Sequence, residues 1–141
     1  MEQKITEQIE SILLSYLKLL HIILLMEEAQ YVLLSTSYYF TTLINLLHIP
    51  NMVIINDTVL LFNYICENNP ETAGIIAQCF IDETSVTSMN TAELSLSILI
   101  CLLDEGIDLE AKVNIIKFLA VLIHSSKSLS SRTKVRLDYL N

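Results

Sequence analysis

Glycine and proline are scarce in this sequence, and their scarcity limits the fold classes open to it. The 141 residues include two glycines and two prolines. Both residues interrupt regular structure, and a β-rich chain with many tight turns needs far more of them. Phosphate-binding loops need several glycines close together, because only glycine lets the backbone approach a phosphate, so nucleotide loops of this kind are excluded. We expect an all-α chain with a few long helices.

Lysine and arginine are absent from the middle of the chain. Between Leu19 and Ala111 there is neither, whereas twelve Asp and Glu fall in that stretch; basic residues return from Lys112 onward, and the net charge is −8. An acidic body repels a polyanion, which excludes direct binding of nucleic acid. The expected partner is a protein or peptide that is basic or amphipathic.

The cysteines do not form a disulfide or metal pattern. They are odd in number, lack C-x-x-C spacing and each lies in an apolar run: Cys66, Cys79 and Cys101. Buried thiols of this kind are typical of a reducing compartment, so we expect an intracellular protein of the cytoplasm or nucleus. Apolar surroundings also raise the pKa of a thiol and suppress its reactivity as a nucleophile.

Residues for catalysis or metal binding are not grouped. The three histidines lie far apart, and none has a Cys, His or acidic partner three or four residues away: His21, His48 and His124. The acidic pairs Glu27-Glu28 and Asp104-Glu105 lie at segment ends, where they indicate solvated helix termini rather than a general acid and base. We expect no enzyme activity, no metal site and no cofactor.

Apolar residues are more abundant than one small domain needs, at 52% with a mean hydropathy of +0.53. The run from Ile12 to Met26 is too short for a bilayer span of about 20 residues and is interrupted by Lys18 and His21. The stretch Met1–Glu10 carries three acids and one lysine, whereas a signal peptide begins with a net positive charge. We interpret this run as a core helix with a wide buried surface, and no membrane partner is expected.

The pattern of apolar residues and breakers predicts about eight helical segments in one domain over residues 1–141. Asn69-Pro70-Glu71 is a cap, a proline at the first helical position and an acid in the first turn. Asn90 with Glu93 has the spacing of a capping box at the start of a helix. Gly106 predicts the end of that helix, and Asp108 predicts the cap of the next one. Loops are expected at 82–90 and 125–131. The predicted helices are 4–26, 28–34, 37–48, 51–67, 70–82, 91–104, 108–124 and 130–140.

Two of these helices carry a narrow polar stripe on an otherwise apolar surface. The residues of the stripes are Asn56, Asn63 and Glu67 on the first, and Glu110, Asn114 and Lys117 on the second. Helical spacing puts the members of each stripe on one face. Because the remaining circumference is apolar, we expect these stripes to be exposed and these six residues to bind the partner.

The chain also resembles the armadillo family over residues 43–81. The resemblance rests on Leu43 to Asn51, an LxxLL-type helix that ends in a polar break, on Val59 to Ile65, on the Asn69-Pro70-Glu71 turn and on Ile75 to Ile81. A fainter second copy is shifted by 54 residues and pairs Val59 with Val113. The resemblance implies a right-handed stack of helices, an armadillo-like α-solenoid of the HEAT type. It also implies that Asn63 bonds a peptide backbone, with Lys117 at the corresponding place of the second copy.

Three functional hypotheses follow. The first is a scaffold or adaptor that holds a partner peptide or helix. The second is a compact helical regulator of the kind with which viruses mimic host apoptosis or signalling proteins. The third is an obligate oligomer subunit that buries its excess apolar surface against another copy. A stack of three-helix layers would favour the first, and a central hydrophobic helix wrapped by others the second. The end at Leu140-Asn141, without a polar tail, fits a piece of a longer protein.

Overall fold

The computed structural model describes the backbone of residues 2–35, 38–86 and 91–140, and the side chains of residues 2–33, 35, 39–79 and 96–125. Within these ranges the regular structure is helical, with no strand, which confirms the all-α class. In chain order the elements are α1 (Glu2–Ile23), α2 (Glu27–Leu34), α3 (Tyr38–Asn45), the short 3-10 helix η1 (Leu46–His48), α4 (Met52–Asn68), α5 (Pro70–Val86), α6 (Thr91–Asp104) and α7 (Leu109–Leu140).

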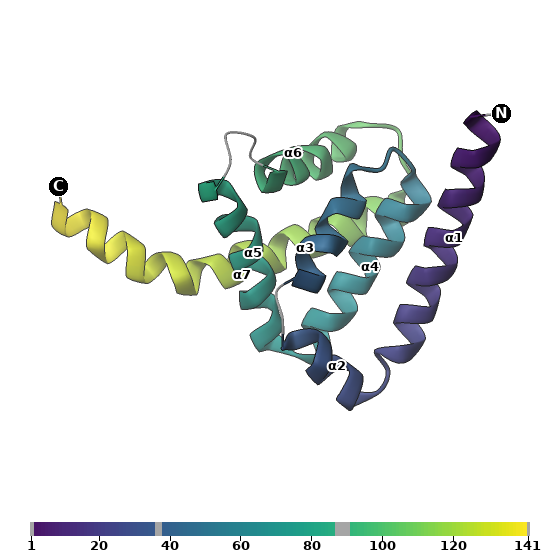
Figure 1. Ribbon diagram of the computed structural model, residues 1–141. Helices are drawn as coiled ribbons and strands as arrows, with labels where there is room; N and C mark the ends of the chain where they lie inside the picture. Colours follow the sequence, from purple (N-terminus) through teal and green to yellow (C-terminus); the bar gives the residue numbers. More distant parts are fainter. Residues whose placement is uncertain (1, 36–37, 87–90, 141) are drawn as a thin grey trace.

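The last two predicted helices form one. α7 is continuous for 32 residues, and its C-terminal part extends away from the other helices (Figure 1). The loop predicted at 125–131 is therefore wrong, and the described ranges hold seven α-helices where eight segments were predicted. No glycine or proline follows Gly106. Serine costs only about 0.5 kcal/mol per residue in a helix, so a run of serines does not end one.

The loop predicted at 82–90 is also shorter than expected. Residues 82–86 continue α5, which ends at Val86. Residues 87–90, and with them the predicted cap at Asn90, lie outside the described residues. The stop near Gly106 is confirmed, since α6 ends at Asp104 and α7 begins at Leu109.

α4 is the central helix of the fold (Figure 1). It packs against α1, α5, α7 and η1. Nine of its 17 residues are buried. Phe62 of α4 stacks on Phe118 of α7, with ring centroids 5.1 Å apart and planes inclined by 8°. Both rings are fully buried, and removing such a side chain from water contributes about 1.5–3 kcal/mol to stability.

Local capping fixes where α4 and α5 begin. Asn51 has an extended backbone, and its Oδ1 accepts hydrogen bonds from the main-chain N–H groups of Val53 and Ile54, at 2.9 and 3.2 Å. Two N–H groups that have no partner within the helix are thereby satisfied. α5 begins at Pro70, as predicted, because proline has no N–H to leave unpaired at that position.

α1 is much less buried than the sequence suggested. Leu17 is its one buried residue, and Ile5, Ile9, Ile12 and Tyr16 are each more than half exposed. The prediction of a core helix with a wide buried surface is therefore wrong. α1 lies at the edge of the fold, with α4 as its main neighbour (Figure 1). One neighbouring helix covers a single stripe of the helix surface and leaves the remainder to solvent.

No single helix in the described part is both long enough and apolar enough to cross a membrane. α1 and residues 27–33 of α2 meet those two criteria as a pair, but the two helices are bent by 119° relative to each other.

Candidate interaction surfaces

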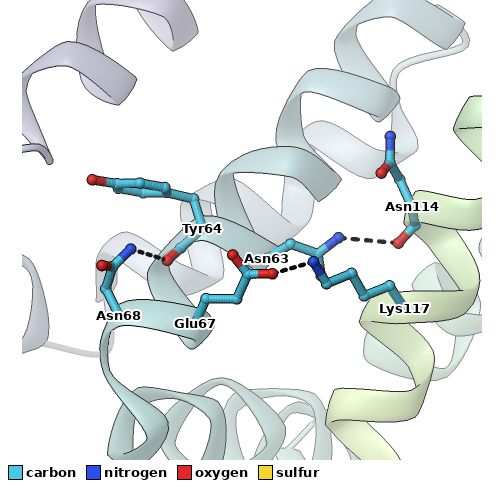
Figure 2. A network of polar contacts seen from close by, with 6 residues as sticks. All are labelled: Asn63, Tyr64, Glu67, Asn68, Asn114 and Lys117. Atoms are coloured by element: carbon cyan, nitrogen blue, oxygen red, sulfur yellow. Dashed lines mark hydrogen bonds and ion pairs between the residues drawn. The ribbon is translucent and has the colours of Figure 1, made fainter.

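The two predicted polar stripes meet each other between α4 and α7 (Figure 2). Asn63 Nδ2 donates a hydrogen bond to the main-chain oxygen of Asn114, at 3.1 Å. Asn114 Nδ2 donates to Asn56 Oδ1, at 3.2 Å. Lys117 forms an ion pair with Glu67. We call these five residues the α4–α7 polar seam. The sixth predicted residue, Glu110, is exposed in the first turn of α7.

Asn63 is the buried member of the seam. Its side chain was expected to be exposed, and that expectation is wrong, because Asn63 is only 5% exposed. α7 covers it, and the side-chain N–H group that was expected to reach a peptide backbone bonds the backbone of α7 instead. The Oδ1 atom of Asn63 is buried and accepts no hydrogen bond from the described residues. A buried acceptor without a hydrogen bond lowers the free energy of unfolding, and this cost offsets part of what the Asn63 hydrogen bond contributes.

Glu67 and Lys117 form the open end of the seam. Both side chains are about half exposed. Exposed ion pairs gain little because water screens the charges, and typical values are about 0.2–1 kcal/mol. The seam therefore runs from a buried amide contact to a solvated ion pair, and its hydrogen-bonding groups largely face each other rather than an open surface.

An apolar groove lies elsewhere, between α1, α2 and α3. Its volume is about 380 Å³, and it opens to solvent. Tyr16, Val32 and Tyr39 line it and are each more than 40% exposed, while Leu24 and Leu43 form buried parts of its wall. The remaining lining residues are Leu20, Ile23, Ala29, Leu33 and Thr42. None of the ten lining residues is charged. Surfaces of this kind fit an apolar ligand.

Hydrogen bonds hold α2, one wall of the groove, in place. Gln30 Nε2 donates to the main-chain oxygen of Leu24 at 2.6 Å, across the turn between α1 and α2. Gln30 Oε1 accepts from Asn69 Nδ2, which lies at the junction of α4 and α5. A short helix of eight residues is marginal by itself. These two bonds tie α2 to the end of α1 and to the junction of α4 and α5, and they position this wall of the groove.

The exposed side of α1 carries a regular row of large apolar side chains. We call this row the α1 outer stripe, and its members are Ile5, Ile9, Ile12, Tyr16, Leu19 and Ile23. Tyr16 and Ile23 also line the groove, so the two surfaces are continuous. The spacing of the stripe is visible in the sequence. Its exposure was missed because apolar residues surround most of α1, and periodicity then does not show which side is buried.

The cysteines are thiols, but they differ in exposure. Cys66 and Cys79 are buried, as predicted. Cys101 of α6 is exposed, so the expectation of a buried thiol is wrong for that residue. Burial, and to a lesser degree the charge of Glu67, raises the pKa of Cys66 from 9.0 to about 12. A thiol with such a pKa is neutral at physiological pH and is a poor nucleophile.

Ionisable groups in the described ranges are dispersed. No three His, Cys, Asp or Glu side chains there lie close enough to hold one metal ion. His21 of α1 contacts the ring of Tyr64 on α4, with centroids 5.9 Å apart, so it packs between helices. Of the aromatic run Tyr38-Tyr39-Phe40, Phe40 is in the core and Tyr39 lies in the groove.

No protein-family model, curated protein or solved structure matches this chain.

Proposed function

We propose that this chain is a non-enzymatic protein-interaction module that binds the apolar face of an amphipathic helix in the groove between α1, α2 and α3. The observation that carries the proposal is the groove itself, an open, uncharged depression walled by three helices. Exposed apolar patches are uncommon on soluble monomers and mark sites of interaction. A groove between helices accepts a helix through anchors spaced i, i+3, i+4 and i+7.

Charge outside the groove supports a partner with a basic polar face. The chain has a net charge of −8, and Glu27 and Glu28 are exposed at the start of α2, beside the groove. An acidic surround attracts a cationic partner at long range, and its influence falls as salt is added. The apolar anchors supply affinity, and the acidic surround raises the rate of association.

The groove is a better partner site than the α4–α7 polar seam. Asn63 and Asn114 use their side-chain N–H groups inside the chain. A peptide that took those bonds would have to displace α7, which also buries Phe118 and Ile115 in the core. The groove requires no such rearrangement.

A synthetic helix tests the proposal directly. The probe is an 18-residue fluorescent peptide of leucine and lysine, patterned so that leucine occupies one helical face. Val32→Gln in the groove should weaken its binding about tenfold, because an apolar contact worth about 1.4 kcal/mol is lost. Val113→Gln is the matched control, since Val113 on α7 is similarly exposed, 53% against 59% for Val32. Fluorescence anisotropy gives both dissociation constants.

Two further peptides separate shape from charge. A scrambled peptide of the same composition has no apolar face and should bind at least tenfold more weakly. A version with glutamine for lysine should retain binding but lose its salt dependence. Equal binding of the patterned and scrambled peptides, or equal effects of Val32→Gln and Val113→Gln, would contradict the groove as the site.

A compact regulator is a second candidate, and the position of α4 favours it. A central hydrophobic helix wrapped by others was expected for that class, and α4 contacts α1, α5 and α7. The armadillo-like stack would instead place the partner along a concave surface formed by α4 and α7. The two valine substitutions distinguish these surfaces, since Val32 lies in the groove and Val113 lies on α7.

A further inference from the structure

The α1 outer stripe has the spacing of a helix-pairing surface. Its six residues follow each other at intervals of four, three, four, three and four, from Ile5 to Ile23. All six are between 41% and 68% exposed. Apolar residues that alternate between three and four residues apart form the a and d positions of a coiled-coil seam. Nothing in α1's packing on α4 accounts for this second row.

The stripe and the buried face of α1 are distinct. The residues of α1 that face the fold are Leu17, which is buried, Glu10, which is bonded to Asn51, and His21, which contacts Tyr64. On a helix with 100° per residue, these positions centre about 140° away from the outer stripe. α1 therefore has two apolar faces, of which the fold covers one.

Charge is nearly excluded from the stripe and its flanks. Lys4, Glu7, Glu10 and Lys18 lie on other sides of α1, and the flanking positions hold Gln8 and Ser15 on one side and Leu13 and Leu20 on the other. The exposed carboxylate of Glu2, three residues before Ile5, continues the stripe at its N-terminal end. A chain of net charge −8 repels another copy of itself over most of its surface. Between Ile5 and Ile23 this face lacks the carboxylates that would cause repulsion, and it equally lacks those that would select a basic partner.

We propose that the α1 outer stripe binds the same stripe of a second copy, with the two α1 helices antiparallel. The spacing reads the same in both directions, so a two-fold axis places each residue opposite another of the stripe. Ile12 then faces Tyr16 of the second copy, Ile9 faces Leu19, and Ile5 faces Ile23. Each such layer pairs an a position with a d position, as antiparallel helix pairs require.

The area agrees with a stable dimer. Complete burial of the exposed parts of the six residues would remove at most about 700 Å² per copy from water, which is within the roughly 600–1,000 Å² that each partner contributes to a standard interface. The proposal goes beyond the groove, because Ile5, Ile9, Ile12 and Leu19 do not line it.

α7 offers a shorter apolar row that competes for the same role. Leu109, Val113, Ile116 and Ile123 are exposed at similar spacing. Lys112 and Lys117 flank this row on its two sides. Pairing two copies through α7 would enclose charged flanks, Lys112 and the ion pair of Lys117 with Glu67, whereas the flanking positions of the α1 stripe between Ile5 and Ile23 are uncharged. The α1 stripe is therefore the better surface for self-association.

Light scattering coupled to size-exclusion chromatography tests the dimer. The unmodified chain should elute at twice its mass of 16.0 kDa. Ile12→Glu, at a residue 68% exposed, should halve that mass, because it places a carboxylate at the centre of the interface. Ile116→Glu on α7, at 55% exposure, is the matched control and should remain dimeric. Circular dichroism should show both variants folded.

A charge-pair rescue tests the orientation. Ile12→Glu and Tyr16→Lys chains should each be monomeric alone and dimeric when mixed. In the antiparallel register the carboxylate introduced in one chain lies opposite the ammonium group introduced in the other, whereas a parallel pair gives no such contact. A monomeric unmodified chain, or a dimer lost with Ile116→Glu and kept with Ile12→Glu, would overturn the proposal. Failure of the rescue alone would overturn the antiparallel register. Val32→Gln should leave the dimer intact, because Val32 lines the groove and is not part of the stripe. Tyr16 and Ile23 belong to both surfaces, so Val32→Gln and Ile12→Glu, each at a residue of one surface alone, test the groove and the dimer separately.

Discussion

Asn63 of α4 donates its side-chain amide hydrogen to the main-chain oxygen of Asn114 on α7, with 3.1 Å between the two heavy atoms. The residues are 51 positions apart in the chain, so the bond joins two helices rather than two turns of one. Asn114 Nδ2 in turn donates to Oδ1 of Asn56, which lies about two turns before Asn63 on α4. Three asparagines thus link the two helices, and Figure 2 shows the bond between Asn63 and Asn114.

Replacing Asn63 by Ala should lower the free energy of unfolding by about 1–2 kcal/mol, since a buried hydrogen bond and its packing are lost. Loss of the unpaired Oδ1 atom offsets part of that cost. Urea denaturation followed by circular dichroism measures the change. Asn68→Ala is the control, because Asn68 is exposed and bonds only Tyr64 of its own helix, at 2.9 Å. Equal, negligible effects of the two substitutions would show that Asn63 does not stabilise the α4–α7 contact.

The sequence predicted the members of the polar seam but not their arrangement. Helical spacing shows that Asn56, Asn63 and Glu67 share a face of one helix, and likewise Asn114 and Lys117 on another. The same spacing results whether a polar face meets water or meets the polar face of a neighbouring helix. Only the tertiary structure distinguishes the two, and here it buries Asn63.

The fold class and several helix ends followed from local chemistry. Two glycines and two prolines predicted an all-α chain, and Pro70 predicted the start of α5. The serine-rich segment at 125–131 was misjudged, because polarity alone does not end a helix when no breaker is present. The exposed side of α1 could not be predicted, since which apolar face of a helix is covered depends on how many neighbours pack against it.

Asn51 should contribute to stability through two separate bonds. Its Oδ1 caps α4, and its Nδ2 donates to Glu10 Oε2 of α1, at 2.8 Å. Asn51→Ala should cost about 1–2 kcal/mol of unfolding free energy, because both the cap and the link between helices are lost. Asn51→Ser retains a capping oxygen and removes the link, so it should cost less. Thermal and urea denaturation of the two variants measure the difference, and an equally large loss in both would assign the effect to the Glu10 link alone.

The two classes of cysteine should differ in reactivity. Cys101 is exposed, and Cys66 and Cys79 are buried. Iodoacetamide should therefore modify one thiol rapidly in the folded protein, and all three after denaturation. Mass spectrometry of the alkylated peptides identifies the sites. The control is Cys101→Ser, which should abolish the fast reaction. Rapid modification of Cys66 in the folded protein would contradict the burial of this residue in the core.

Stability should fall at high pH because of Cys66. Its pKa is raised from 9.0 to about 12, chiefly by burial and secondarily by Glu67. Below about pH 9 the Cys66 thiol is neutral in the folded and in the unfolded chain, so it does not make the free energy of unfolding depend on pH there. Between about pH 9 and 12 the unfolded chain releases the proton while the folded chain retains it, so the folded state loses stability as pH rises. Urea midpoints at pH 8 and 10.5 should therefore decrease less for Cys66→Ala than for the unmodified chain. The other ionisable groups are the same in both proteins, so parallel decreases would exclude the thiol as a cause.

The exposed end of the polar seam should matter far less than its buried end. Glu67 and Lys117 are both about half exposed, and water screens their attraction. A double-mutant cycle of Glu67→Gln and Lys117→Met should give a coupling energy below about 1 kcal/mol. The coupling should diminish further in 0.5 M salt, because added ions screen the attraction between exposed charges. The effect of Asn63→Ala should be insensitive to the same salt, since its bond is buried and neutral. If the Glu67–Lys117 coupling exceeded the loss caused by Asn63→Ala, the ion pair rather than the asparagines would hold α7 against α4.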